Sequence, residues 1–180
     1  MIETASATLT PWDNFYIMLG SAAAALTGLM FVVITLVTSW ERPGRSHAGI
    51  STFSTPTVVH FGAALLMSAV LSAPWPTLLG PAVTLGTVGL AGVVYIARVW
   101  SGAKTFTEYN PDTEDGIFYT LLPLLAYLSI FAGALTLPAR PAGAMFVLAA
   151  GIALLIFIGI RNSWDIVTYI VITSNDTADK

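Results

Sequence analysis

The chain has 180 residues, of which 56% are hydrophobic and only 9% carry a charge, and its net charge is −3. So few charges, against a usual level of about 25%, exclude a soluble surface of normal size. The acidic balance argues against a nucleic-acid partner, which needs clustered Lys and Arg. The absence of cysteine excludes a disulfide framework, a thiol nucleophile and an iron–sulfur cluster, and two histidines argue against a structural zinc site. We therefore expect no metal and no cofactor.

Four stretches contain no Lys, Arg, Asp or Glu: Asn14–Trp40, Ser46–Ala97, Gly116–Ala139 and Pro141–Ile160. Three of them fit one crossing of a bilayer core of about 30 Å. The second has 52 residues and is interrupted by Pro74, Pro76 and Pro81, so it predicts two helices and a turn. The prediction is an all-α fold with five transmembrane helices in a single domain, 1–180.

The expected helices cover about 15–39, 54–75, 81–100, 114–137 and 142–161. The apolar run at 162–173 then either continues the last helix or turns to lie in the membrane interface. Residues 1–13 and those past Ser174 are expected to be short tails, and 101–115 a loop. Pro56 is placed near a helix start, whereas Pro123 is expected to kink its helix.

Basic residues are distributed unequally between the two predicted sides of the membrane. Only Arg140 lies on one side, and six lie on the other: Arg42, Arg45, Arg98, Lys104, Arg161 and Lys180. Because Lys and Arg are retained in cytoplasmic loops, the N-terminus is predicted outside and the C-terminus in the cytoplasm. All five tryptophans fall near predicted helix ends, as expected for the headgroup layer: Trp12, Trp40, Trp75, Trp100 and Trp164.

A stripe of small residues, Gly20, Ala24 and Gly28, recurs every four residues in the first helix. Such a stripe allows close approach of another backbone in lipid, either within the same bundle or from a neighbouring subunit. Ser21 and His60 suggest a hydrolase only if they meet, and they are predicted near opposite faces of the membrane.

A second group of polar residues is predicted at the cytoplasmic ends of the helices: His60, Arg98, Arg161, Asn162 and Asp165. Asp165 follows the end of a predicted helix, where the dipole disfavours a carboxylate, so it should pair with a nearby arginine. Asn162 and His60 are expected to complete the hydrogen bonds. The alternatives are a polar functional site at the inner leaflet and an interfacial anchor with a surface ion pair.

Several segments carry a resemblance to known proteins, among them Asn14–Tyr16, Ala25–Gly28, Thr55–Phe61 and Asn162–Asp165. With Phe31–Leu36, Ser72–Trp75 and Val167–Ile170, they resemble an uncharacterised family of small bacterial integral membrane proteins. The first helix alone also resembles multispanning proteins labelled modulators of the membrane-anchored AAA protease. This chain has Arg161 where that uncharacterised family has a histidine, so the resemblance implies no imidazole chemistry there.

These features predict a non-enzymatic, multi-pass protein of the bacterial inner membrane that acts through helix contacts as an accessory or regulatory subunit. Its expected partners are the lipid bilayer and either further copies of itself or a larger membrane complex. The alternative is an oligomeric channel or small transporter with a polar site at the cytoplasmic leaflet. A membrane enzyme ranks third, because no catalytic constellation is evident in the sequence.

Overall fold

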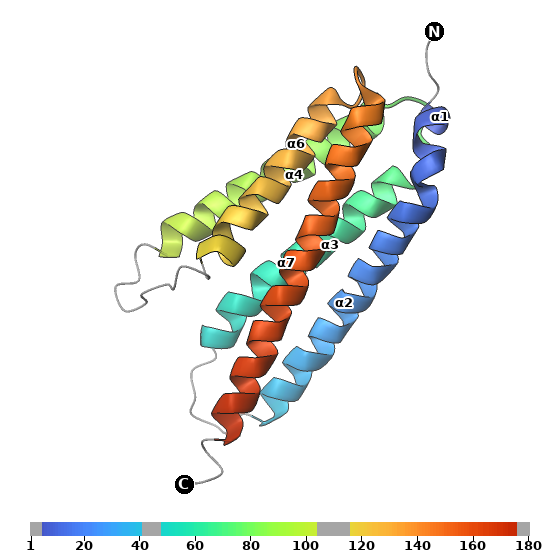
Figure 1. Ribbon diagram of the computed structural model, residues 1–180. Coiled ribbons are helices and arrows are strands. Elements are labelled where there is room, and N and C mark those ends of the chain that lie inside the picture. The colour runs from blue at the N-terminus through green and yellow to red at the C-terminus, as the bar shows by residue number, and fades with distance from the viewer. Residues whose placement is uncertain (1–4, 41–47, 104–115, 176–180) are drawn as a thin grey trace.

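Helices form every regular element in the part of the chain that the computed structural model describes, residues 5–40, 48–103 and 116–175. Side chains are described for 5–35, 55–99 and 116–168. The elements in chain order are α1 (Ala5–Leu9), η1 (Thr10–Trp12), α2 (Asp13–Trp40), α3 (Ala48–Leu71), α4 (Leu79–Ala103), η2 (Ile117–Leu121), α6 (Leu122–Thr136) and α7 (Pro141–Asn175) (Figure 1). The prediction of an all-α fold is confirmed.

Four helical segments are long and apolar enough to cross a membrane: Ala5–Thr35, Leu79–Val99, Ile117–Thr136 and Pro141–Thr168. The fifth candidate is α3, which has 24 residues and so is about 36 Å long. Within the side chains that the structure describes, its apolar part is the shorter segment Thr55–Leu71. The four long segments indicate a membrane protein. The number of crossings is five if α3 also crosses the membrane and four if it does not.

The helices are arranged around α7, which packs against α6 on one side and α3 on the other. Helix α4 packs on α6, and α2 packs on α3 and more lightly on α7. Figure 1 shows that α2, α3, α4, α6 and α7 alternate in direction along the chain. The start of α1 and the end of α7 therefore lie at opposite ends of the bundle. Helix α7 makes most of the contact between the α4–α6 pair and the α2–α3 pair, and α3 also contacts α4 lightly.

Glycines allow two of these helix contacts to be close. A Cβ atom added to Gly92 on α4 would overlap the ring of Tyr127 on α6, and one added to Gly159 on α7 would overlap the ring of Phe61 on α3. Phe61 and Tyr127 are both almost completely buried. Since helix association in lipid depends on packing, these glycines fix which helix faces meet.

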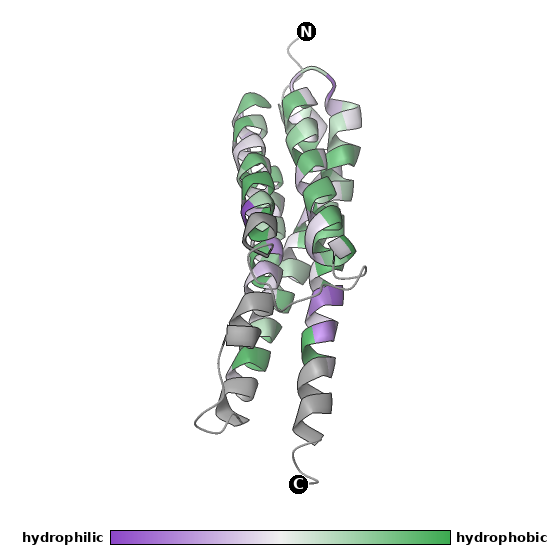
Figure 2. Ribbon diagram, turned by 90° about the vertical axis from the view of Figure 1, so that its left-hand side faces the viewer, coloured by the Kyte–Doolittle hydropathy of each residue, from purple (hydrophilic) through white to green (hydrophobic). Residues whose placement is uncertain are grey.

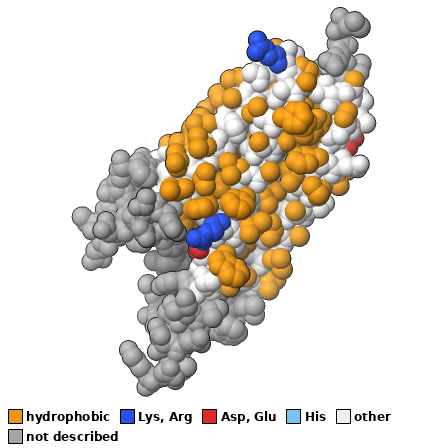
Figure 3. All heavy atoms as spheres, viewed as in Figure 1, with side chains coloured by type: hydrophobic (Ala, Val, Ile, Leu, Met, Phe, Trp, Pro, Cys, Tyr) orange, Lys and Arg blue, Asp and Glu red, His pale blue; other side chains and the backbone are white. Residues whose placement is uncertain are grey.

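The outward surface is largely apolar. Large hydrophobic side chains are exposed on every long helix, for example Phe31 (58%), Val83 (58%), Phe146 (69%) and Phe157 (58%). Figure 2 shows hydrophobic colour along most of the described helices, with hydrophilic colour in a stretch toward the C-terminal end of α7 and at a few other places. Hydrophobic side chains also cover most of the described face in Figure 3. This is the surface that a lipid environment favours, since water would make such exposure costly.

The structure corrects several predicted helix boundaries. The N-terminal segment is not a tail, because α1 and η1 precede α2 and Ala5, Thr8 and Leu9 are buried. Pro56 lies inside α3 rather than near its start. The π-helical turn Ile117–Leu121 runs directly into α6, so Pro123 lies inside the continuous helical segment Ile117–Thr136, as predicted, and the irregular turn immediately precedes it.

Helix α7 settles the open alternative for the final segment, because it continues without interruption to Asn175. The predicted tail past Ser174 lies almost entirely outside the described residues. Most of the predicted loop at 101–115 also lies outside them, although residues 101–103 belong to α4.

Candidate functional site at the α3–α6–α7 contact

The predicted polar residues divide into a buried group and a surface group. His60 and Asn162 are completely buried, whereas Arg161 and Asp165 have about a third of their side-chain surface exposed and Arg98 is exposed. The five residues therefore divide between the interior of the bundle and its surface. The buried residues come from α3 and α7, and the structure adds one from α6.

His60 is anchored to α6 by Tyr127, whose hydroxyl lies 3.0 Å from Nδ1 of the imidazole. The two ring centroids are 5.7 Å apart. The other ring nitrogen, Nε2, is buried and has no hydrogen-bond partner among the described residues. The interior thus contains a side-chain hydrogen bond between α3 and α6, and Nε2 of His60 is available for a second one.

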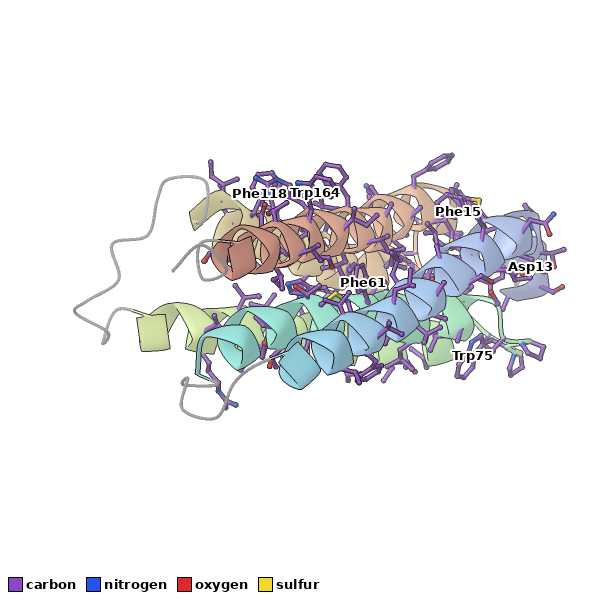
Figure 4. The ribbon with its side chains drawn as sticks, turned by 90° about the horizontal axis from the view of Figure 1, so that it is seen from below. Asp13, Phe15, Phe61, Trp75, Phe118 and Trp164 are labelled. Carbon is purple, nitrogen blue, oxygen red and sulfur yellow. The ribbon has the colours of Figure 1, made fainter. Side chains whose placement is uncertain are left out.

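Asn162 on α7 is the second buried polar residue. Its side chain is fully shielded, and neither Oδ1 nor Nδ2 has a hydrogen-bond partner among the described residues. Gly159, which precedes Asn162 by about one helical turn, lies against Phe61 of α3. Figure 4 shows Phe61 in the interior of the bundle between α3 and α7. Asn162 is therefore close to the same α3–α7 contact that carries His60 and Phe61.

Arg161 and Asp165 form an ion pair one turn apart on α7. The guanidinium carbon of Arg161 also lies 5.3 Å from the ring centroid of Phe118, which is within range of a cation–π contact. Figure 4 shows Phe118 and Trp164 on the outer side of the bundle, away from Phe61. The ion pair thus faces outward beside aromatic residues, while Asn162, between them in sequence, faces inward.

Comparison with protein-family models, with curated proteins and with solved structures finds no match to this chain. The resemblance to a family of small bacterial membrane proteins therefore stays a prediction.

Among the described residues, no group of three or more His, Cys, Asp or Glu side chains could hold a metal ion. Ser21 is exposed on α2, whereas His60 is buried and bonded to Tyr127, so the two do not form a nucleophile and base. The chemistry that the buried groups can perform is hydrogen bonding: an amide provides both donors and an acceptor, and imidazole Nε2 provides one or the other.

Tyr127 is the member of the site that the sequence analysis missed. Its position within an otherwise apolar helix is the signal that could have revealed it, because a buried tyrosine hydroxyl normally requires a hydrogen-bond partner. His60 was the only described histidine deep in an apolar run and was the natural candidate for that partner.

The three residues of the small-residue stripe have different surroundings in the structure. Gly20 packs against Ser68 of α3, since a Cβ at this glycine would lie 3.1 Å from that of Ser68. Ala24 is exposed, and Gly28 is exposed with no atom within 4 Å of an added Cβ. Packing inside the bundle therefore explains Gly20 alone, and contact with another subunit remains a prediction for Ala24 and Gly28.

Proposed function

We propose that this protein is a non-enzymatic, multi-pass protein of the bacterial inner membrane that acts through helix contacts as an accessory or regulatory subunit of a larger complex. The observation that carries the proposal is the outward face of α2. Ser21, Ala24, Ala25 and Gly28 are all exposed there and share one face of the helix at spacings of three and four residues. In lipid, a face of small side chains favours another helix because the two backbones can approach closely.

Other features support the same reading. Among the four long apolar segments, the one that contains α2 is the least buried, with only 17% of its most apolar stretch inside the bundle. Its flanking residues Ile17, Leu29 and Val32 are exposed and apolar, so a partner helix would extend the contact on either side of the stripe. The uneven distribution of basic residues supports an orientation with the N-terminus outside, α3 crossing as the fifth span, and the C-terminus in the cytoplasm.

Photo-crosslinking in native membranes tests the contact. A photoreactive residue at Val32, one turn beyond Gly28, should yield an adduct with a distinct protein. The control position is Val83 on α4, which is similarly exposed (58% against 53%) but faces outward from a different helix. We expect a protein adduct from position 32 and only lipid adducts from position 83.

Gly28→Leu provides the second arm of this experiment. It should abolish the adduct at position 32 without lowering the stability of the isolated protein, because the space around Gly28 is open. Lipid adducts alone at both positions, or an adduct that persists in Gly28→Leu, would contradict the proposal.

A channel or small transporter is the second candidate, and the buried, unpartnered amide of Asn162 favours it. Polar groups at membrane depth are costly and commonly mark a pathway. Purified protein reconstituted into liposomes should then carry a proton or potassium flux above that of protein-free liposomes, measured with an entrapped dye. Asn162→Leu should reduce that flux, and Arg98→Gln, which alters an exposed residue, should not. Equal flux with and without the protein would exclude conduction of these ions.

A further inference from the structure

A hollow of about 470 Å³ lies at the end of the bundle where α1 meets the start of α7. Its walls come from α1, from η1 and from the first residues of α7, and they include Thr8, Trp12, Arg140 and Gly143. This is the opposite end from the Arg161–Asp165 pair, since Arg161 follows Arg140 by 21 residues along α7, or about 31 Å. In Figure 3, Lys and Arg colour appears at two places on the displayed face, one of them at this end of the bundle.

The charge and backbone of this hollow suit an anion. Arg140 is exposed and forms no ion pair with any described residue. It directly precedes α7, and its carbonyl accepts a backbone hydrogen bond from the N–H of Ala144 at 3.1 Å. The N–H groups of Ala142 and Gly143 precede that bond and therefore have no partner inside the helix. The aligned dipoles of a 35-residue helix add positive potential at this point.

Thr8 supplies an independent indication of a ligand. It lines the hollow although only 9% of the residue is exposed, and its hydroxyl forms no hydrogen bond with the described residues. A hydroxyl without a protein partner at the wall of a hollow is available to hydrogen-bond a group that enters it. Thr8 and the first turn of α7 thus present unused donors to the same space from two elements.

The walls are held together before any ligand arrives. The ring of Trp12 packs edge-on against Phe146 with centroids 4.7 Å apart. The Tyr16 hydroxyl donates to the Met145 carbonyl at 3.2 Å, which ties α2 to α7 directly below the hollow. An aromatic group of this kind at a helix end is typical of the headgroup layer of a membrane.

We propose that this hollow is a phosphate-binding site, with Arg140, the Thr8 hydroxyl and the first N–H groups of α7 as ligands. The phosphate can belong to the headgroup of an anionic lipid or be a free phosphate, and the two share the same recognition chemistry. The site is independent of the proposed partner contact on α2 and of the polar residues at the other end of the bundle.

Native mass spectrometry on delipidated protein in detergent tests the site. The three probes are phosphatidylglycerol, diacylglycerol, which has the same acyl chains but no phosphate, and inorganic phosphate. We expect retention of the phosphate-bearing lipid over diacylglycerol if the source is a lipid. Stabilisation against heat by inorganic phosphate, without lipid retention, identifies a free phosphate as the ligand.

Substitutions locate the binding. Arg140→Gln should weaken it about tenfold, the loss expected for one charge-assisted contact, and Thr8→Val should weaken it to a smaller extent. Arg140→Lys should retain part of the binding. Arg98→Gln removes an exposed arginine at the other end of the bundle and should change nothing. Because Arg140 is exposed, its variants should unfold at the same temperature as the unmodified protein without ligand.

Two outcomes would overturn the proposal. One is equal retention of phosphatidylglycerol and diacylglycerol together with no stabilisation by inorganic phosphate. The other is an equal loss of binding in Arg140→Gln and Arg98→Gln, which would show attraction to net charge rather than a site.

Discussion

At the scale of single residues, the polar side chains inside the bundle differ in how well their hydrogen bonds are satisfied. Tyr127 and His60 satisfy each other in part, whereas Asn162 has neither amide group paired among the described residues. Buried amides without partners are destabilising, so their presence needs a functional or structural compensation. The two cases give opposite predictions for substitution.

Asn162→Leu should raise the stability of the protein. The substitution keeps a similar volume and removes two unpaired polar groups, each of which costs about 1–3 kcal/mol when buried. The measurement is the free energy of unfolding in detergent, by titration with a denaturing detergent. A fall in stability would show that the amide is satisfied, and Ser163→Ala, next to it on α7, is the control for disturbing this turn of the helix.

Tyr127→Phe should lower stability by about 1–3 kcal/mol, because it leaves Nδ1 of His60 buried without its partner. Tyr95→Phe is the matched control: Tyr95 is only partly buried, and its hydroxyl forms no hydrogen bond with the described residues. Unfolding followed by circular dichroism should separate the two variants. Equal effects would mean that the His60–Tyr127 bond contributes nothing particular to the contact of α3 with α6.

At the scale of elements, the length of α7 determines where its polar residues lie. Thirty-five residues correspond to about 52 Å, well beyond a hydrocarbon core of about 30 Å. If Arg140 marks one boundary of the core, Arg161 and Asp165 fall about 31–38 Å further on, at the other boundary. An ion pair that is one-third exposed beside Phe118 and Trp164 fits that position, where charged and aromatic groups meet the headgroups.

The contact between α4 and α6 should be sensitive to a single methyl group. Gly92→Ala places a Cβ against the Tyr127 ring, which cannot rotate freely because it is buried and bonded to His60, so a loss of about 1–3 kcal/mol is expected. Gly28→Ala on the open face of α2 should be neutral or stabilising by up to about 1 kcal/mol, through helix propensity alone. Thermal unfolding of both variants in one detergent measures the difference. If they melt together, α4 and α6 are not held by this close contact.

At the scale of the whole molecule, the alternation of five long helices leaves the first and last described residues at opposite ends. The distribution of basic residues is the basis for predicting which end faces the cytoplasm. Six of seven basic residues belong to the predicted cytoplasmic side, and the exception, Arg140, belongs to the end with the hollow.

Cysteine labelling tests this orientation directly, because the chain has no cysteine of its own. Single cysteines at Thr77 and Lys104 should react differently with an impermeant reagent in intact cells. Thr77 lies in the short turn between α3 and α4 and is exposed, so it should be labelled. Lys104 follows α4 and should be labelled only after the cells are opened. The reverse pattern would invert the topology, and labelling of both in intact cells would show that α4 does not cross the membrane.

The sequence by itself determined the helical fold, the approximate helix positions and the expectation of a membrane protein. These depend on local properties, namely charge-free length, proline positions and aromatic residues at helix ends, which are legible in a linear chain. The prediction that Pro56 lies near the start of its helix was wrong, because a proline in the sequence does not reveal that further helical residues precede it.

Only the tertiary structure decided which residues face one another. The four-residue spacing of Gly20, Ala24 and Gly28 predicts one face but not whether that face meets α3 or the exterior, and only Gly20 meets α3. In the same way, His60 and Arg161 are at similar depths in the sequence-based arrangement, yet one turns inward to Tyr127 and the other outward to Asp165. Depth follows from position along each helix, whereas partnership depends on how the helices rotate and pack, and that is set by long-range contacts such as those of Gly92 and Gly159.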